Sequence, residues 1–549
     1  EPAEEARDHP AVTSTVSASL RKDADGRRSP FRRVLVANRG EIAVRIIRAC
    51  HELGVEAIAV FSDADATAQH VRAADEAVRL GPAPAAESYL RIDAILDAAA
   101  RSGAEAIHPG YGFLAERAEF ARAVEDTGLA FVGPGSATIA ALGDKLAARR
   151  GAAEAGVPIV PGTLEPAPVD RPDEVAAIVA EAGHVGYPLL VKAAAGGGGR
   201  GMRRVESPDE LPGALAAGSA EAKSAFGDGS VYLEREVRPA RHVEVQLLGD
   251  ADGRIVALGE RDCSLQRRHQ KLVEESPAPG LGADLRRELH AAAVRAARAA
   301  GLVNAATVEF LLDPDGRFWF LEVNTRLQVE HGVSELVAGV DIVREQLWIA
   351  AGRPLSREVV AAAEHAPAPS RHAIEVRISA EDPSRAFVPT PGRIGRWEMP
   401  SGPGVRVDTG FGAGDRVPPD YDPLIAKLMV VDGDRDRAIA RLGRALDETV
   451  VTGIQTTLPF HRHVAGHAGF RAGELSTDWV AEAWDPAMAG QRNAALAAAS
   501  WVAAWAAKET VDRALGAEPG RGGDSRHDVD GRSAWSRTGL VRATDRWPR

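Results

Sequence analysis

The 549-residue sequence has little of several features that define particular classes of protein. Its only cysteines are Cys50 and Cys263, so no disulfide framework beyond one bridge can form, and a reducing compartment such as the cytoplasm is expected. No run of 18 apolar residues occurs, which argues against a membrane-spanning helix. Residues 1–30 lack the apolar core of a secretory signal and are expected to form a flexible leader.

Basic residues are also in deficit. The sequence has 66 lysines and arginines against 78 acidic residues, a formal net charge of −12. A protein that binds nucleic acid without sequence preference needs a basic surface, so this balance argues against nucleic acid as a partner. A local basic pocket for a small anion is compatible with it.

The order of strand and helix patterns divides the chain into units. In residues 31–143, apolar strand patterns at 34–37, 56–61 and 104–108 alternate with helical patterns at 41–53, 90–103 and 118–127, which predicts an α/β unit with a parallel sheet. We expect a second unit at 144–368, in which residues 160–236 form a mobile sub-domain, and a β-rich third unit at 369–484. Residues 485–549 contain an alanine-rich helical pattern at 494–507 and a polar, glycine-rich stretch at 518–531 that is expected to be disordered.

Paired carboxylates mark the first candidate site. Residues 307–312 alternate as a strand, residues 313–316 are a turn, and the extended pattern resumes at Arg317. If Leu312 pairs with Arg317, Glu309 and Glu322 are diagonal neighbours on one face, roughly 7–8 Å apart. Together with the amide oxygen of Asn324, they are hard ligands that suit Mg²⁺ or Mn²⁺, with nucleotide phosphates in the remaining positions.

The alternation continues beyond this pair. It predicts that five polar residues face one way along the same strand: Glu322, Asn324, Arg326, Gln328 and Glu330. A solvated strand face is the alternative interpretation. Five chemically different residues, with an arginine between two acids, favour a site.

A glycine-rich run marks a second candidate site. Lys192 ends a strand pattern, and residues 196–201 follow with five glycines and Arg200. Backbone amides of glycine can approach phosphate oxygens, and Lys192 can neutralise them. The alternative is a flexible hairpin loop. The run is not a P-loop, because no Gly-Lys-Ser/Thr follows it.

A third stretch, residues 260–271, is dense in cations and hydrogen-bond donors, as an anion pocket would be. The alternative is a solvated basic loop. Cys263 is interpreted as a small packing residue, because no partner for a nucleophile is evident.

These stretches together resemble the ATP-grasp enzymes, and more narrowly the biotin carboxylase component of biotin-dependent acyl-CoA carboxylases. The resemblance covers about residues 31–485, and its landmarks are residues 37–43, 108–114, 196–202, 261–271, 322–331 and 377–383. It implies an N-terminal Rossmann-like domain, an ATP-grasp domain with a glycine-rich lid, and a C-terminal β-rich domain.

The resemblance also implies roles for individual residues. The nucleotide-contacting positions match Lys145, Lys192, Gly198, Gly199, Glu234, Arg235, Val237, His242 and His269. The metal ligands match Glu309, Glu322 and Asn324. The bicarbonate site matches Lys271, Arg326, Gln328, Val329 and Glu330, and the residue that holds the biotin ureido oxygen matches Arg377.

The activity implied is ATP-dependent carboxylation of biotin by bicarbonate, with Glu330 as general base. The family's biotin carrier bears a lysine between two methionines, and none of the seven lysines here has that setting. Either the biotin carboxyl carrier is a separate polypeptide, or the sequence is cut short before a carrier domain. The resemblance also implies a carboxyltransferase subunit and a homodimer or larger assembly. Gly332 stands where relatives usually have proline, and Arg235 where several have lysine.

Two other functions are weighed against this one. Another ATP-grasp ligase would share the metal pair and lid but should lack the pocket of residues 326–330 and Arg377. A non-catalytic carboxylase subunit should have damaged motifs, and none is damaged here. The acceptor, whether an acyl-CoA or pyruvate, is set by the carboxyltransferase, which this chain lacks.

Overall fold

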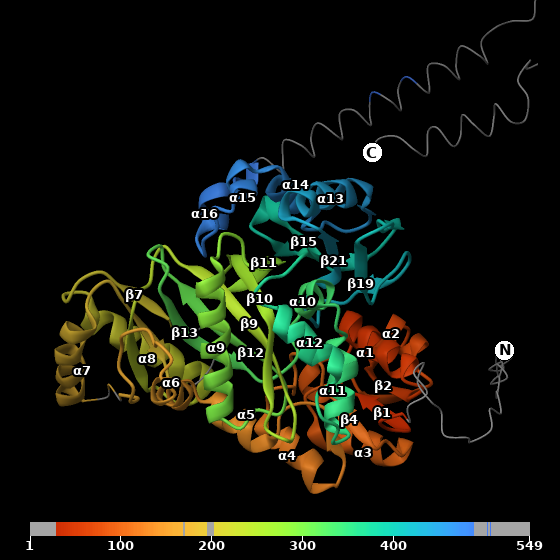
Figure 1. Ribbon diagram of the computed structural model, residues 1–549, viewed down its shortest axis with the longest axis horizontal. Coiled ribbons are helices and arrows are strands. Elements are labelled where there is room, and N and C mark those ends of the chain that lie inside the picture. Colours follow the sequence, from red (N-terminus) through yellow and green to blue (C-terminus); the bar gives the residue numbers. More distant parts are fainter. Residues whose placement is uncertain are drawn as a thin grey trace, which may run out of the picture.

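The computed structural model describes residues 29–167, 169, 171–194, 202–487, 502 and 506. Figure 1 shows an N-terminal unit (red and orange), a small unit around α7 and α8 (yellow), and a C-terminal unit (blue), joined by a central sheet. The predicted leader up to residue 28, Gly198 and Gly199, the stretch at 518–531, and all of the alanine-rich pattern except two residues lie outside this description.

Five parallel strands, in the order β3-β2-β1-β4-β5, form the first sheet. They are β1 (Arg33–Val36), β2 (Glu56–Ser62), β3 (Glu76–Gly81), β4 (Ala106–His108) and β5 (Ala130–Phe131), with α1 (Gly40–Glu52), η1 (Asp63–Asp65), α2 (Gln69–Ala73), η2 (Ala85–Glu87), α3 (Ile92–Ser102), α4 (Ala118–Asp126) and α5 (Ser136–Gly143). The parallel α/β arrangement is confirmed. β3 was not predicted, because this edge strand has exposed charged residues at Glu76 and Arg79 instead of a continuous apolar run.

A second, antiparallel sheet has the order β7-β6-β8. Its strands are β6 (Leu189–Ala193), β7 (Arg203–Val205) and β8 (Val231–Arg235), and the helices of this region are α6 (Lys145–Glu154), α7 (Pro172–Val185) and α8 (Leu211–Phe226). The three strands share a small core with α7 and α8 that includes Ile178, Leu189 and Leu215, whereas α6 packs into the core under the central sheet.

Eight antiparallel strands form the central sheet, in the order β13-β12-β9-β10-β11-β14-β21-β19. They are β9 (Arg241–Gly249), β10 (Ile255–Arg267), β11 (Gln270–Ser276), β12 (Asn304–Leu312), β13 (Phe318–Asn324), β14 (His372–Ser379), β19 (Val405–Thr409) and β21 (Leu424–Asp432). The strands of the third predicted unit therefore extend the sheet of the second, because β14 pairs directly with β11.

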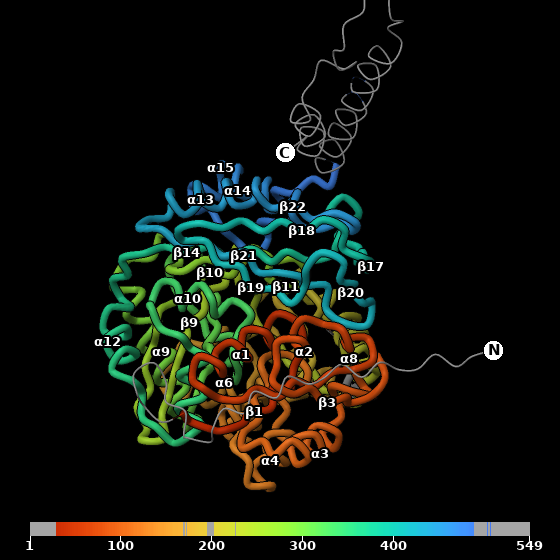
Figure 2. Tube along the Cα trace, turned by 90° about the vertical axis from the view of Figure 1, so that its right-hand side faces the viewer, coloured from red at the N-terminus to blue at the C-terminus, as the bar shows by residue number. Residues whose placement is uncertain are grey.

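Helices and short strands complete this assembly. The helices are α9 (Ala283–Ala299), α10 (His331–Ala338), α11 (Ile342–Ala350), α12 (Arg357–His365), η3 (Pro383–Arg385), α13 (Arg435–Glu448), α14 (Leu458–Gly466), α15 (Ala468–Ala472) and α16 (Trp479–Ala483). The short strands are β15 (Glu381–Asp382), β16 (Val388–Pro389), β17 (Gly392–Arg393), β18 (Trp397–Glu398), β20 (Arg416–Val417) and β22 (Val450–Val451). Figure 2 shows α13, α14 and α15 at one end of the molecule and the N-terminal unit at the other.

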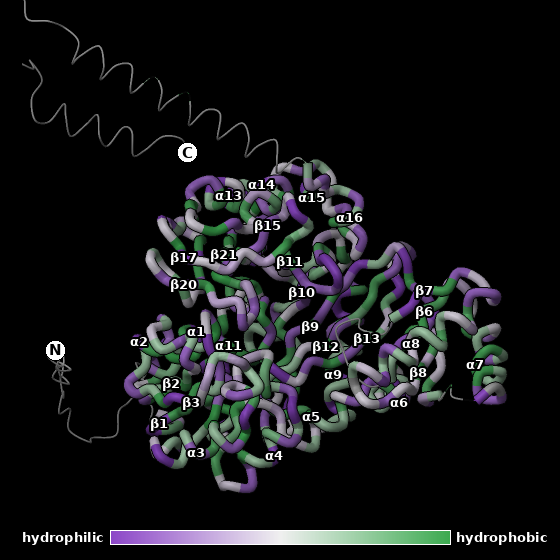
Figure 3. Tube along the Cα trace, turned by 180° about the vertical axis from the view of Figure 1, so that it is seen from behind, coloured by the Kyte–Doolittle hydropathy of each residue, from purple (hydrophilic) through white to green (hydrophobic). Residues whose placement is uncertain are grey.

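Polar and apolar stretches alternate along the chain (Figure 3). Among the residues that the structure describes, no helix is both long and apolar enough to cross a membrane.

Candidate active site

A row of charged residues crosses four neighbouring strands of the central sheet. Glu309 on β12 lies directly opposite Glu322 on β13 and, on its other side, opposite Glu244 on β9. Glu244 in turn lies opposite Arg261 on β10. Residues that are directly opposite share one face of a sheet, so the row gathers three carboxylates on a single face.

The predicted register between Glu309 and Glu322 was wrong. Leu312 pairs with Phe318 instead of Arg317, and an irregularity between Glu309 and Phe310 shifts the pairing by one more position. A bulge of this kind adds a residue on one strand and re-aims its side chains. Glu309 therefore faces Glu322 directly, and the two carboxylates are closer neighbours than the diagonal pair that was predicted.

The strand predicted to run through Glu330 was also wrong. β13 ends at Asn324, residues 325–330 form a loop, and Glu330 is the N-cap residue of α10. Hydrogen bonds, and not strand alternation, hold part of the predicted set together, since Arg326 donates to Asn324 Oδ1 at 3.1 Å and to Gln328 Oε1 at 3.0 Å.

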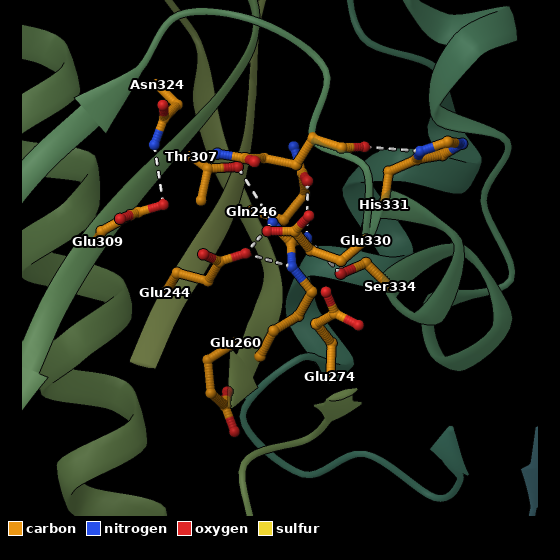
Figure 4. Close-up of polar contacts among 12 residues, drawn as sticks. Glu244, Gln246, Glu260, Glu274, Thr307, Glu309, Asn324, Glu330, His331 and Ser334 are labelled. Atoms are coloured by element: carbon orange, nitrogen blue, oxygen red, sulfur yellow. Dashed lines mark hydrogen bonds and ion pairs between the residues drawn. The ribbon is translucent and has the colours of Figure 1, made fainter. Parts of the chain in front are cut away.

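Glu330 lies at the centre of the site. Its side chain is fully buried, Lys271 Nζ lies 2.7 Å from Oε1, and Arg377 Nη2 lies 2.9 Å from Oε2. Figure 4 shows the carboxyl groups of Glu244, Glu274 and Glu330 in the same part of the site. Three segments that are distant in the sequence, β11, the loop before α10 and β14, thus meet at one carboxylate.

Lys271 connects Glu330 to the row of carboxylates. Its ammonium group lies 2.5 Å from Glu244 Oε2 and 2.9 Å from Glu309 Oε1, in addition to its contact with Glu330. Burial alone would lower the pKa of Lys271, but the three carboxylates outweigh it and raise the pKa well above its usual value. Lys271 is therefore a fixed positive charge inside the site.

The residues predicted to bind a divalent cation lie together. Asn324 donates from Nδ2 to Glu309 Oε1 at 2.9 Å (Figure 4), and Glu322 lies opposite Glu309. Burial opposes ionisation of Glu309, but Lys271 and His242 outweigh it and lower the pKa to about 2. Two neighbouring carboxylates offer hard oxygen donors that suit Mg²⁺ or Mn²⁺. The Asn324 amide directs its nitrogen to Glu309 and its oxygen to Arg326.

Gln328 and Arg326 offer hydrogen-bond donors to an anion. Gln328 is 3% exposed, and its Nε2 has no hydrogen-bond partner within the described part of the chain. Arg326 is held by Glu116, whose Oε2 lies 2.8 Å from Nε, and makes no ion pair with Glu330. A buried amide that is free to donate can satisfy a bound anion, so this corner of the site is compatible with a small oxyanion.

The residues predicted to contact a nucleotide come from several elements. Lys145 begins α6 and lies 3.6 Å from Glu322, and Val237 follows β8 and is half-buried. Lys192 on β6 contacts Glu234 on β8 directly, and Arg235 lies 5.7 Å from the centre of the Trp319 ring. His242 on β9 lies 3.0 Å from Glu309, whereas His269 is exposed at the tip of the β10–β11 hairpin.

The segment at 260–271 is a hairpin and not a solvated loop. β10 continues to Arg267, and β11 begins at Gln270. Arg261 is fully buried and donates to Glu244, Gln246, Ser334 and Thr307. The interpretation of Cys263 as a buried residue agrees with its complete burial.

Three residues that shape the site were not predicted from the sequence. Arg149 is buried and contacts Glu234, Glu244 contacts Lys271, and Glu274 contacts Arg377. One signal was available: residues 241–246 alternate, so His242, Glu244 and Gln246 share a face of β9.

Family models match most of the described chain. Residues 30–139 match the biotin carboxylase N-terminal domain, residues 144–358 the ATP-binding domain of the carbamoyl-phosphate synthase L chain, and residues 375–482 the biotin carboxylase C-terminal domain.

Individual relatives cover the same region. The chain is 49% identical over 451 residues to a biotin carboxylase from Pseudomonas aeruginosa (82% of this chain, 97% of the relative). It is 47% identical over 455 residues to a pyruvate carboxylase subunit from Methanothermobacter thermautotrophicus (82% and 90%). It is 48% identical over 461 residues to the biotin-dependent acyl-coenzyme A carboxylase alpha3 subunit of Mycobacterium leprae (83% and 75%).

Two solved structures are similar over the same span. One is the biotin carboxylase–βγ-ATP complex from Campylobacter jejuni, with a TM-score of 0.78 and 42% identity (82% of this chain, 99% of that one). The other is the biotin carboxylase domain dimer of the 2-oxoglutarate carboxylase from Hydrogenobacter thermophilus in complex with MgADP, ADP and bicarbonate, with a TM-score of 0.77 and 42% identity (82% and 97%).

Proposed function

The chain belongs to the biotin carboxylase family of ATP-grasp ligases, and from this premise we propose that it catalyses the first half-reaction of a biotin-dependent acyl-CoA carboxylase. In this reaction biotin on a carrier protein is carboxylated by bicarbonate and ATP. The substrates and cofactors are ATP, Mg²⁺ or Mn²⁺, bicarbonate and biotin.

One observation carries the proposal: the buried carboxylate of Glu330 contacts both Lys271 and Arg377. A general base must lie within hydrogen-bond reach of the proton that it removes. Lys271, Gln328 and Arg326 offer donors to the bicarbonate oxyanion close to Glu330, and the backbone of Val329 lies in the same loop. Arg377, on the other side of Glu330, is the donor for the ureido oxygen of biotin.

The proposed reaction proceeds through carboxyphosphate. Glu330 removes the proton of bicarbonate, whose oxygen attacks the γ-phosphorus of ATP, and the bond to ADP breaks. Carboxyphosphate splits into CO₂ and phosphate, and the phosphate removes the N1′ proton of biotin. Arg377 stabilises the enolate charge on the ureido oxygen while N1′ forms a bond to CO₂.

The remaining predicted residues bind and orient the nucleotide. A divalent cation held by Glu309, Glu322 and Asn324 would neutralise charge on the phosphates. Lys145, Lys192 and the backbone amides of Gly198 and Gly199 would hold the phosphates, and Glu234, Arg235, Val237, His242 and His269 would contact the rest of the nucleotide. The unit at 160–236 would close over the site and exclude water from carboxyphosphate.

The acyl-CoA type of carboxylase is favoured by the similarity to the alpha3 subunit from Mycobacterium leprae. The similarity to the pyruvate carboxylase subunit from Methanothermobacter thermautotrophicus makes pyruvate the second candidate acceptor. We test the choice by adding a biotinylated carrier with either an acyl-CoA carboxyltransferase or a pyruvate carboxyltransferase. Product from acetyl-CoA or propionyl-CoA supports the first, and product from pyruvate alone contradicts it.

The partners would be a biotin carboxyl carrier, a separate carboxyltransferase and a second copy of this chain. A domain dimer among the similar solved structures supports the homodimer. Sedimentation equilibrium of the purified chain tests it. The cytoplasm is the proposed location, in line with two buried cysteines that form no disulfide.

The reaction itself is tested by ADP release from ATP with and without bicarbonate and free biotin. We expect release that depends on bicarbonate and is stimulated by biotin. Glu330→Gln and Arg326→Ala should each lose carboxylation by about 10²–10⁴-fold while MgATP still binds. Normal turnover in either variant would refute the role of that residue, and binding of MgATP without any ADP release by the unmodified chain would support a non-catalytic role in a carboxylase assembly.

A further inference from the structure

Two buried glutamates lie side by side behind Arg377. Glu274 on β11 is directly opposite Glu375 on β14, and both side chains are completely inaccessible to solvent. Glu274 Oε1 lies 2.6 Å from Arg377 Nε and 2.5 Å from Nη2, the nitrogen that also contacts Glu330 Oε2 at 2.9 Å. Arg377 is thus held between two carboxyl groups.

Most oxygens of this pair of glutamates lack a partner. Within the described residues, neither oxygen of Glu375 nor Oε2 of Glu274 has a hydrogen-bond partner. The Glu375 carboxyl also faces α10, since a Cβ atom on Gly332 would lie 3.6 Å from its Oε2. An ionised carboxylate that is buried without hydrogen bonds is very costly, so such a group keeps its proton.

The charged groups around Glu274 and Glu375 also favour a protonated carboxyl group. Glu274 faces Arg377 and Glu375 on β14, Glu330 from the loop before α10, Lys271 on its own strand and Cys263 on β10. Glu375 faces Lys427 on β21, as well as Glu274, Arg377 and Glu330.

The two nearby lysines have other acidic partners. Lys271 also contacts Glu244 and Glu309, and Lys427 lies 3.1 Å from Glu41. Carboxyl groups therefore outnumber the cations available to them.

We propose that Glu274 is a positioning residue for Arg377, and that the Glu274–Glu375 pair keeps one proton on Glu375 while Glu274 gains and loses the other. When Glu274 is ionised, two carboxylates fix Arg377 through Nε and Nη2 and align it for the ureido oxygen. When Glu274 is neutral, Arg377 keeps its charged contact with Glu330 alone. This inference rests on the proposed carboxylation of biotin.

The direction of the pH effect follows from burial. Burial raises the pKa of Glu274 to about 7, although Arg377 acts against it, and burial raises the pKa of Glu375 well above its usual value. Biotin-stimulated ADP release should therefore fall as the pH decreases through about 7. The titration belongs to the pair as a whole, so variants are needed to assign it.

The test compares Glu274→Gln, Glu375→Gln and the exposed control Glu87→Gln across about pH 6 to 8. In Glu274→Gln we expect the transition near neutral pH to disappear and the KM for biotin to rise by at least about fivefold, with MgATP binding unchanged. Glu375→Gln and Glu87→Gln should keep the transition. A transition that persists in Glu274→Gln, or disappears in Glu375→Gln, overturns the assignment.

Infrared spectroscopy provides a test that needs no activity. At about pH 8 the unmodified chain should show the C=O band of a protonated carboxylic acid, and Glu375→Gln should lack it. Absence of that band from the unmodified chain overturns the inference even if Glu274→Gln fails to fold. A chain that shows the band but releases no ADP with biotin contradicts only the proposed function.

Discussion

The ammonium group of Lys427 lies 2.9 Å from the backbone carbonyl of Val329, the residue that precedes Glu330. Lys427 is on β21 and fully buried, and its Nζ also lies 3.1 Å from Glu41 on α1. One side chain therefore connects the N-terminal unit, the loop that carries the candidate base and the C-terminal part of the central sheet.

Replacement of this lysine should destabilise the chain and displace the loop. In Lys427→Met the buried Glu41 loses its cationic partner, and an uncompensated buried charge costs about 3–5 kcal/mol. We expect a lower midpoint of unfolding in urea, and biotin-stimulated ADP release at least about tenfold slower because the Val329 carbonyl is released. Urea titration followed by circular dichroism measures the first effect.

The double variant Glu41→Gln/Lys427→Met is the control. It removes both charges, so it should be more stable than Lys427→Met alone. If the double variant loses as much free energy of unfolding as the two single variants together, Glu41 and Lys427 do not stabilise each other as their contact indicates.

The sequence predicted those parts of the fold that depend on neighbouring residues. The parallel sheet follows from alternating strand and helix patterns, and Glu309, Glu322 and Asn324 come from a single hairpin. The register between β12 and β13 could not be predicted, because the pattern of apolar residues does not reveal the irregularity next to Glu309.

The contacts of Glu330 could not be derived from local pattern at all. Lys271 and Arg377 belong to other strands, and their link to Glu330 came only from resemblance to a family. The alternation of polar residues wrongly predicted a strand up to Glu330, whereas Glu330 is the N-cap residue of α10. The proximity of Glu274 to Glu375 could not be predicted from the sequence, because it depends on the pairing of β11 with β14.

Gly332 lies against the side chain of Met429. A Cβ atom on Gly332 would collide with Met429 Sδ, and Met429 is fully buried on β21. We expect Gly332→Ala to destabilise the chain by about 1–3 kcal/mol through overpacking. Thermal unfolding measures this loss of stability.

Two variants make this comparison specific. Gly443→Ala, in the middle of α13 where a Cβ meets no atom, should be neutral or slightly stabilising. Adding Met429→Ala to Gly332→Ala should recover part of the loss. If Met429→Ala only adds its own cost, Met429 is not the reason for glycine at this position.

Glu322 gives the cleanest test of the metal site, because its only ion pair in the described chain is a contact with Lys145 at 3.6 Å. Glu322→Gln removes one of two facing carboxylates, and we expect Mn²⁺ to bind at least about tenfold more weakly in the presence of ADP. Electron paramagnetic resonance of free Mn²⁺ measures this. The exposed control Glu119→Gln should bind Mn²⁺ as the unmodified chain does, and equal binding by Glu322→Gln would remove Glu322 from the ligand set.

Three buried histidines should make the chain sensitive to acid. Burial lowers the pKa of His70 and His461 to about 4 and that of His108 to about 3. An unfolded histidine titrates near 6.5, so below that pH the unfolded chain binds more protons, and stability falls as the pH decreases toward 4. At about pH 5.5 each histidine should lower the free energy of unfolding by about 1.4 kcal/mol relative to neutral pH.

His461, whose Nε2 lies 2.6 Å from the Arg377 carbonyl oxygen, is the histidine to replace. His461→Gln should lose less stability between about pH 7.5 and 5.5 than the unmodified chain, whereas the exposed control His365→Gln should lose as much. Equal acid sensitivity in all three chains, measured by urea unfolding, would show that His461 is not held neutral in the folded state.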